Sequence, residues 1–158
     1  MSAGLDDKIG LVTCHGALDV LVNNAGIVIP GTGEDATLAD WRTTQAVNQA
    51  VNGESVFLGA QRAIAAMRER GGSIITISSI EGIVGEPRAD AYNYSKGGVR
   101  IFTKSADLAC GQKGYPIQVN SIHPGFILAP LVEEGLASDE SKYMTGAELV
   151  IDGGYTCH

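Results

Sequence analysis

The sequence predicts an α/β fold in which a mainly parallel sheet packs against long helices. Short runs rich in valine and isoleucine alternate along the chain with longer stretches in which apolar residues recur at helical spacing. Unbroken apolar runs are typical of parallel strands that are buried on both faces, because such strands carry no solvent-facing side. Strands that alternate with helices predict an α/β sandwich.

The first predicted elements are a helix end and a buried strand. Leu5, Ile9 and Val12 lie at positions i, i+4 and i+7, so residues 5–14 are predicted to end an amphipathic helix. Residues 18–26 (LDVLVNNAG) form a short apolar run that stops at an Asn-Asn-Ala-Gly loop. This run predicts a buried parallel strand.

The rest of the chain continues the alternation of helices and strands. Thr37 and Asp40 are spaced as a capping box, which opens a long helix predicted to end near Arg70. Glycine and proline residues mark the ends of the later segments. These segments are a strand at 71–79 (GGSIITISS), a helix from about 90 to 110, a strand at 117–125 (IQVNSIHPG) and a short strand at 146–154 (GAELVIDGG).

Composition predicts one soluble globular domain spanning residues 1–158. The chain has 44% hydrophobic and 18% charged residues, which is typical of a folded protein with a buried core. Its 11 Lys and Arg residues are outnumbered by 18 Asp and Glu residues, so the net charge is −7. This balance argues against a nucleic-acid or anionic-membrane surface, because no basic block is available to meet phosphates.

The cysteines and the hydropathy of the chain predict a cytoplasmic protein without a metal site. Cys14, Cys110 and Cys157 are odd in number and show no C-x-x-C spacing, so reduced thiols are expected rather than disulfides or a zinc site. No apolar run reaches membrane-spanning length, and the first residues lack the apolar core of a signal peptide.

Polar residues that can carry chemistry follow the predicted strands. In a parallel α/β sheet, ligands bind beyond the carboxyl ends of the strands. Those ends hold residues 23–26, the pair Ser78 and Ser79, and residues 123–125. The sequence therefore predicts a binding cleft that these three groups share.

Two tyrosines and a lysine lie close together at the start of the second long helix. Tyr92 and Lys96 are four residues apart, so they share one helix face, whereas Tyr94 points elsewhere. Taken alone, a pair at this spacing is either an exposed helix pair or a proton-transfer site. Free tyrosine has a pKa of about 10, and a neighbouring ammonium group lowers it. The surrounding motifs decide between the two interpretations.

Four motifs occur in order along the chain and together resemble one family. They are NNAG at 23–26, ISS at 77–79, Tyr92-x-x-x-Lys96 and HPG at 123–125. Their order and intervals resemble those of the short-chain dehydrogenase/reductase family, and residues 78–106 look especially like its bacterial secondary-alcohol dehydrogenases and ketoreductases. The resemblance spans nearly the whole chain. It implies a partial Rossmann-like (doubly wound) sheet of about four mainly parallel strands with long helices.

The resemblance implies an NAD(P)-dependent oxidoreductase that transfers hydride between a nicotinamide and a secondary alcohol or ketone. It gives Tyr92 the acid/base role, because a proton must move on or off the substrate oxygen as the hydride moves. Lys96 would lower the pKa of Tyr92 and hold the hydroxyls of the nicotinamide ribose. Ser79 would hydrogen-bond the substrate oxygen where charge develops. Tyr94 stands where the family usually has a small residue, and we interpret it as a core or subunit-contact aromatic.

A relay asparagine and a set of cofactor contacts are also implied by the resemblance. Residues 45–48 and 49–52 both read QAVN. Counting forward from Trp41 selects Asn48 as the relay residue, whereas counting back from the following segment selects Asn52, which we slightly favour. The expected contacts to NAD or NADP are Asn23, Asn24, Ala25, Gly26, Tyr92, Lys96, Pro124, Gly125 and Ile127.

Besides the QAVN repeat, the sequence departs from the family pattern in two further places. The family receives the cofactor pyrophosphate at a Gly-x-x-x-Gly-x-Gly turn. No such turn precedes the strand at 18–26, and the glycines of residues 30–35 (PGTGED) are expected to lie in a loop. The segment after HPG is shorter than in the family, where it contributes to substrate selectivity.

These departures predict association with other chains. A strand at 18–24 without a neighbour on one side would expose unpaired backbone donors and acceptors. The two long helices that form subunit contacts in the family are both present, so a homo-oligomer or association with a full-length relative is expected. The alternative function is that of a catalytically impaired fragment that acts as an interaction or oligomerisation subunit.

Overall fold

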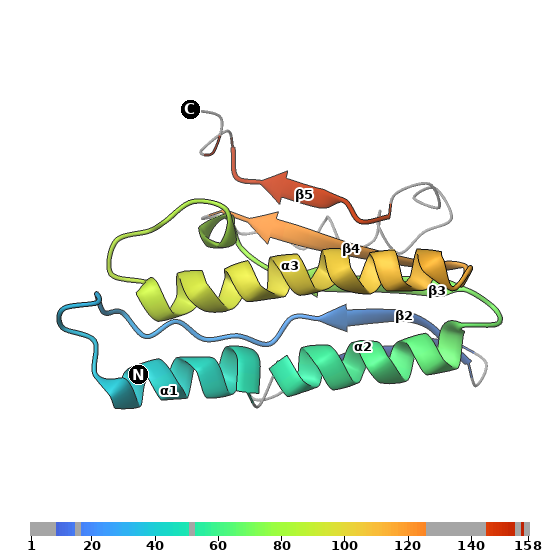
Figure 1. The fold of residues 1–158 in the computed structure, drawn as a ribbon, viewed down its shortest axis with the longest axis horizontal. Helices are drawn as coiled ribbons and strands as arrows, with labels where there is room; N and C mark the ends of the chain where they lie inside the picture. Colours follow the sequence, from blue (N-terminus) through green and yellow to red (C-terminus); the bar gives the residue numbers. More distant parts are fainter. Residues whose placement is uncertain (1–8, 15–16, 51–52, 126–144, 154–155, 157–158) are drawn as a thin grey trace.

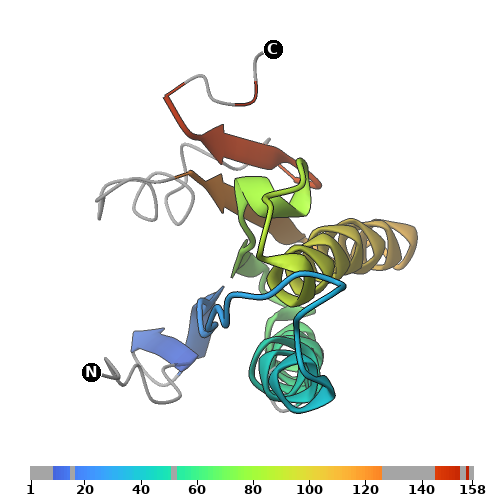
Figure 2. The same cartoon turned by 90° about the vertical axis from the view of Figure 1, so that its left-hand side faces the viewer.

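One sheet with helices against one of its faces makes up the described part of the chain. The computed structural model describes residues 9–14, 17–50, 53–125, 145–153 and 156. Within them, five strands lie in the order β1-β2-β3-β4-β5 (Figures 1 and 2). In chain order the elements are β1 (Ile9–Cys14), β2 (Ala17–Asn23), α1 (Leu38–Gln45), the π-helical turn η1 (Ala46–Ala50), α2 (Gly53–Met67), β3 (Gly72–Ile77), the 3₁₀ turn η2 (Ile80–Gly82), α3 (Asp90–Gln112), β4 (Ile117–Pro124) and β5 (Glu148–Ile151).

Four of these strands run parallel, as the sequence predicts. β2 pairs with β3, β3 with β4, and β4 with β5, so that Leu21, Ile74 and Val119 lie side by side. Right-handed crossovers that advance in one direction place their helices on the same face of a sheet. The helices α1, α2 and α3 do lie on one face (Figure 2). The predicted parallel α/β fold is confirmed.

The core fills the space between the sheet and the helices α2 and α3. Its buried members are Leu21, Ala63, Met67, Ile74, Ala106, Cys110, Ile117 and Val119. A second, smaller cluster contains Ile75 and Ile122, with Val20, Val22 and Leu149 packed against them. Ile74 and Ile75 belong to different clusters because neighbouring strand residues face opposite sides of the sheet. Burial on both sides explains the unbroken apolar run of β3.

The first described strand corrects two expectations. Residues 9–14 form β1, antiparallel to β2, with Cys14 opposite Ala17, whereas a helix end was predicted at 5–14. Three apolar residues at helical spacing fit a helix, but the segment is rich in β-branched residues and the edge of β2 supplies backbone partners. The expectation of an open edge on β2 is therefore also wrong, because β1 covers it.

The helix predicted from Thr37 to about Arg70 is confirmed at its start and interrupted in its middle. The Thr37 hydroxyl accepts a hydrogen bond from the backbone N–H of Asp40 at 3.0 Å, which completes the predicted cap. α1 ends at Gln45, the π-helical turn η1 follows, and α2 begins at Gly53. η1 overlaps the QAVN repeat, so the extra residues change the helix geometry locally. Such turns often occur at functional sites.

Three further observations concern membrane-spanning helices, metal ligands and cysteine. In the described part of the chain, no helix is both long and apolar enough to cross a membrane. The same residues contain no group of three His, Cys, Asp or Glu side chains placed to hold a metal ion. Cys110 is a buried free thiol whose pKa is raised, chiefly by burial.

An ion pair between the last strand and α3 holds β5 in the sheet. Glu148 at the start of β5 accepts hydrogen bonds from Arg100 Nε at 2.6 Å and from Arg100 Nη2 at 3.0 Å. Lys104 Nζ lies 2.8 Å from the same carboxylate. These contacts, with the Arg100 hydrogen bonds first, lower the pKa of Glu148 to about 2. The carboxylate therefore stays ionised across the neutral and weakly acidic range.

We expect Glu148→Gln to lower the free energy of unfolding at pH 7 by about 2 kcal/mol, because it removes charge-assisted hydrogen bonds to Arg100. The folded-state pKa lies below the ordinary value of 4.5, so this stabilisation is complete above pH 4.5 and is lost as the pH falls through about 2. Urea unfolding of the wild-type protein and of Glu148→Gln between pH 2 and 7 measures this stabilisation and its loss.

The matched control is Glu69→Gln, whose contact with Arg68 is exposed on both sides and should contribute almost nothing. Equal losses from the two substitutions would contradict the role given to Glu148.

Candidate active site

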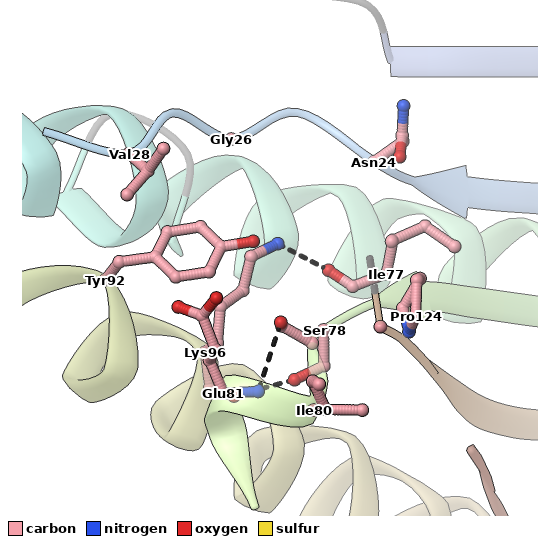
Figure 3. A pocket seen from close by; sticks show the side chains of 12 residues that line it. Asn24, Gly26, Val28, Ile77, Ser78, Ile80, Glu81, Tyr92, Lys96 and Pro124 are labelled. Atoms are coloured by element: carbon pink, nitrogen blue, oxygen red, sulfur yellow. Dashed lines mark hydrogen bonds between the residues drawn. The ribbon is translucent and has the colours of Figure 1, made fainter. Parts of the chain in front are cut away.

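A pocket of about 360 Å³ lies at the carboxyl ends of β2, β3 and β4, where the sequence predicts a cleft (Figure 3). The loop after β2, the turn η2 and the first turns of α3 complete its wall. Its lining residues are Asn24, Gly26, Val28, Ile77, Ser78, Ser79, Ile80, Glu81, Tyr92, Lys96, Pro124 and Gly125. The pocket therefore brings together residues from all four motifs.

Tyr92 and Lys96 lie next to each other in this pocket (Figure 3). Lys96 Nζ is 5.5 Å from the centroid of the Tyr92 ring, and only 5% of Lys96 is exposed. An exposed helix pair would show two solvated side chains, so that interpretation is excluded. Tyr94 points away from the pocket: it is 59% exposed, and its ring centroid lies 5.3 Å from that of Trp41. Tyr94 is thus not a core residue within this chain.

The ammonium of Lys96 is fixed by a bond to the end of β3. Nζ donates a hydrogen bond to the carbonyl of Ile77 at 2.8 Å. Burial lowers the pKa of Lys96 to about 8, while the charge of Glu81 acts in the opposite direction. An ammonium has three donors, so Nζ can donate further hydrogen bonds to a ligand in the pocket. A Cβ at Gly26 would come within 3.4 Å of Nζ, so the glycine leaves room beside the ammonium.

The pKa of Tyr92 is raised above its ordinary value of 10, mainly by burial. A hydrogen bond with the Ser79 side chain lowers it, and the charge of Glu81 raises it. The sequence led us to expect a lowered pKa because of Lys96. That expectation is not met in this structure, because burial penalises the phenolate and a second charged group, Glu81, lies close by.

Ser78 and Ser79 make different hydrogen bonds, one to α3 and the other within the turn η2. The Ser78 hydroxyl donates to the backbone carbonyl of Lys96 at 2.9 Å and so holds α3 against the end of β3. Ser79 begins the turn η2, and its hydroxyl accepts from the backbone N–H of Glu81 at 3.1 Å. The Ser79 side chain also lowers the pKa of Tyr92, which lines the same pocket. Ser78 is thus occupied by a contact with α3, whereas Ser79 lines the pocket together with Tyr92.

Asn48 lies buried in η1 and clamps the loop that follows β2. Its Oδ1 accepts from the backbone N–H of Ile27 at 2.8 Å, and its Nδ2 donates to the carbonyl of Ile27 at 2.8 Å. Nδ2 also lies 3.0 Å from the hydroxyl of Ser95 on α3. Asn52, the other candidate for the relay role, lies outside the described residues.

Only some of the remaining residues predicted to contact the cofactor line the pocket. Asn24, Gly26, Pro124 and Gly125 line the pocket, whereas Asn23 and Ala25 are not among its lining residues. The side chain of Asn23 lies against Gly59 of α2, where an added Cβ would be 3.0 Å from its Oδ1. Ile127 lies outside the described residues.

Glu81 was missed by the sequence reasoning. It lines the pocket two residues after Ser79, and its Oε2 is buried without a hydrogen-bond partner in the described structure. Its pKa is raised by burial and by the charge of Glu86, while Lys96 opposes the shift. Its place two residues after the ISS motif was the one available signal in the sequence.

Comparisons with known proteins agree with this site. Residues 10–140 match the model of the short chain dehydrogenase family. An NADP-dependent (R)-specific alcohol dehydrogenase of Lentilactobacillus kefiri is 43% identical over 173 residues, with 89% of this chain and 67% of that protein covered. A trans-4-hydroxycyclohexanecarboxylate dehydrogenase of Sinomonas cyclohexanicum is also 43% identical, with 89% of this chain and 61% of that protein covered.

A solved structure shows the same arrangement of elements. An acetoin dehydrogenase from Salmonella typhimurium superposes with a TM-score of 0.78 and 30% identity, covering 90% of this chain and 66% of that one. The chain therefore belongs to the short-chain dehydrogenases, an oxidoreductase family whose members use NAD or NADP. It spans about two thirds of the length of these relatives.

We expect Gly82→Ala to push η2 away from α3, because a Cβ at Gly82 would lie 2.8 Å from the backbone carbonyl of Lys96. Overpacking against rigid backbone costs about 1–3 kcal/mol. The measurement is the free energy of unfolding from urea titration. Gly85→Ala is the matched control, since a Cβ there meets nothing within 4 Å. Equal stability of the two variants would contradict the close packing of η2 on α3.

Proposed function

We propose that this protein is an NAD(P)-dependent oxidoreductase that moves hydride between a nicotinamide and a secondary alcohol or ketone. The observation that carries the proposal is the convergence of Ser79, Tyr92 and Lys96 in one pocket. The names of the relatives, which are alcohol, hydroxy-acid and acetoin dehydrogenases, point to the same class of substrate.

The residues of the pocket fit the nicotinamide end of the cofactor. Lys96 offers ammonium donors for ribose hydroxyls beside Gly26, which leaves room for a ring or sugar to approach. Asn24, Pro124 and Gly125 close the other side. A cavity of about 360 Å³ is within the range of small-ligand sites. When bound there, the nicotinamide supplies or accepts the hydride.

Each catalytic side chain has a separate task in this proposal. The Ser79 hydroxyl hydrogen-bonds the substrate oxygen and keeps it next to the phenol of Tyr92. Tyr92 gives a proton to that oxygen when a ketone is reduced and takes one when an alcohol is oxidised. Lys96 is anchored on Ile77 and offers its remaining Nζ donors to the hydroxyls of the nicotinamide ribose beside Tyr92. Asn48 is proposed as the relay position, because its clamp on Ile27 aligns the loop beside Lys96.

The raised pKa of Tyr92 sets the expected pH dependence. Alcohol oxidation requires the phenolate, so its rate is expected to rise with pH beyond neutrality. Ketone reduction requires the protonated phenol and is expected to hold a plateau at neutral pH and to fall at alkaline pH.

Tyr92→Phe is expected to lower kcat by about 100-fold or more, because general acid–base catalysis contributes about 10²–10⁴-fold. The affinity for NADPH should change little, since Lys96 and Gly26 remain. Steady-state rates with 2-butanone and 2-butanol, with nicotinamide fluorescence for binding, measure both quantities.

Tyr94→Phe is the matched control: it removes the same hydroxyl two residues away on an exposed side chain, and it should leave the rates unchanged. Unchanged turnover in Tyr92→Phe would sink the catalytic proposal and favour the alternative, a catalytically impaired interaction subunit.

We also propose that the protein is a single cytoplasmic domain that forms a homo-oligomer through α2 and α3. Large apolar side chains on these helices are exposed in the single chain, among them Phe57, Ile101 (60% exposed) and Leu108 (65% exposed). Burying such side chains against a second copy would remove them from water. The buried free thiol of Cys110 agrees with a reducing compartment.

Sedimentation equilibrium tests the assembly. The wild-type chain should sediment as a multiple of its own mass, and Ile101→Lys together with Leu108→Lys should shift the equilibrium towards the monomer. Thr43→Lys, an exposed polar position on α1 outside the proposed interface, should not. A monomeric wild-type protein would contradict the proposed assembly without touching the proposed chemistry.

A further inference from the structure

A buried histidine connects β4 to the serine of the site. His123 is 0% exposed and does not line the pocket. Its Nδ1 lies 2.9 Å from the backbone carbonyl oxygen of Ser79, and its Nε2 lies 2.9 Å from the hydroxyl oxygen of Ser121. The proposed proton transfer does not use this ring, so both of its contacts call for another explanation.

The partners of the ring determine where its proton lies. A carbonyl oxygen can only accept a hydrogen bond, so Nδ1 carries the hydrogen and donates it to Ser79. Burial, the largest influence, lowers the pKa of His123, so the ring is neutral at neutral pH. Nε2 is therefore unprotonated and accepts from the Ser121 hydroxyl. The result is a directed chain from Ser121 through the ring of His123 to the peptide of Ser79.

This bond is the one side-chain contact that ties the peptide of Ser79 to a neighbouring strand in the described structure. The carbonyl of Ser79 also accepts from Gly82 N–H at 3.0 Å, and its hydroxyl accepts from Glu81 N–H at 3.1 Å. Both donors belong to η2 and move with the turn that Ser79 begins. His123 instead belongs to β4, which is paired on both sides, opposite Val150 of β5 on one of them. The bond from His123 thus attaches the start of η2 to a strand that is held on both sides by the sheet.

We propose that His123 is a positioning residue that fixes the peptide of Ser79, so that the serine hydroxyl faces Tyr92. The expected effect of His123 on turnover rests on the proposed function. The hydrogen bonds of His123 to Ser79 and Ser121 do not depend on it. A misplacement of about 1 Å at a reacting group can cost about 100-fold in rate, so a fixed serine peptide matters for catalysis. Ser78, one residue earlier, is already held by its backbone bond to Ile122 at 2.8 Å, which leaves Ser79 as the first residue beyond the strand pairing.

Two matched substitutions separate positioning from packing. His123→Asn keeps a donor near the position of Nδ1 and loses the contact to Ser121. His123→Gln places its amide near the position of Nε2 and loses the contact to Ser79. Both remove the ring, so both should lower stability by similar amounts. We expect kcat to stay within about 5-fold of wild type in His123→Asn and to fall about 30-fold or more in His123→Gln, with the KM for cofactor unchanged in both.

Two spectroscopic measurements test the proposal without turnover. Nitrogen NMR of a His15→Gln/His158→Gln background leaves His123 as the only histidine of the three in the chain. It should show a protonated Nδ1 and an unprotonated Nε2. Absorbance titration of the tyrosines, with Tyr92→Phe subtracted, should show Tyr92 titrating at higher pH in His123→Gln than in wild type, because its bond from Ser79 is weakened. His123→Asn should match wild type.

The outcomes separate the two proposals. A wild-type protein that turns over no alcohol or ketone would defeat the proposed function, while the nitrogen shifts and the Tyr92 titration would still decide the role of His123. An unprotonated Nδ1 would overturn that role even if neither variant folded. Equal loss of kcat in the Asn and Gln variants, or a Tyr92 titration that neither substitution moves, would overturn it as well.

Discussion

The junction between the end of β3 and the start of α3 holds the site together, and Lys96 lies at its centre. The ammonium of Lys96 donates to Ile77, and the backbone carbonyl of Lys96 accepts from Ser78, so strand and helix are bonded in both directions. Gly82 lets the turn η2 approach that same carbonyl. Burying an ammonium is unfavourable: a pKa lowered from 10.5 to about 8 corresponds to about 3 kcal/mol in favour of the neutral form. The two hydrogen bonds at the junction therefore form at an electrostatic cost, and they hold the Lys96 ammonium inside the pocket.

The charges of the pocket oppose one another. Glu81 favours the ammonium of Lys96 and disfavours the phenolate of Tyr92, whereas the hydroxyl of Ser79 favours the phenolate. Tyr92 therefore rests as a neutral phenol, ready to donate a proton. Under the proposed function, the neutral phenol is the form that donates a proton when a carbonyl group is reduced. Alcohol oxidation requires conditions that withdraw the proton.

Much of the fold and part of the site could be predicted from the sequence, because they rest on local patterns. The periodicity of β3 and α3, the cap at Thr37 and the four-residue spacing of Tyr92 and Lys96 are all readable from neighbouring residues. The QAVN repeat shows the limit of such reasoning. Counting residues left Asn48 and Asn52 open, and the π-helical turn that buries Asn48 against Ile27 depends on contacts with a loop 21 residues away.

The sequence by itself determined the order of strands and helices from residue 18 onward, the motifs at the strand ends and the family, since each depends on residue types at short spacing. Only the tertiary structure decided the remaining features. β1 is a strand because the edge of β2 offers it backbone partners, which no local pattern records. Glu81 and His123 have their roles because folding brings one into the pocket and bonds the other to Ser79, 44 residues away in the chain. Burial and long-range hydrogen bonds are set by the packed chain, and they decide which polar groups carry charge.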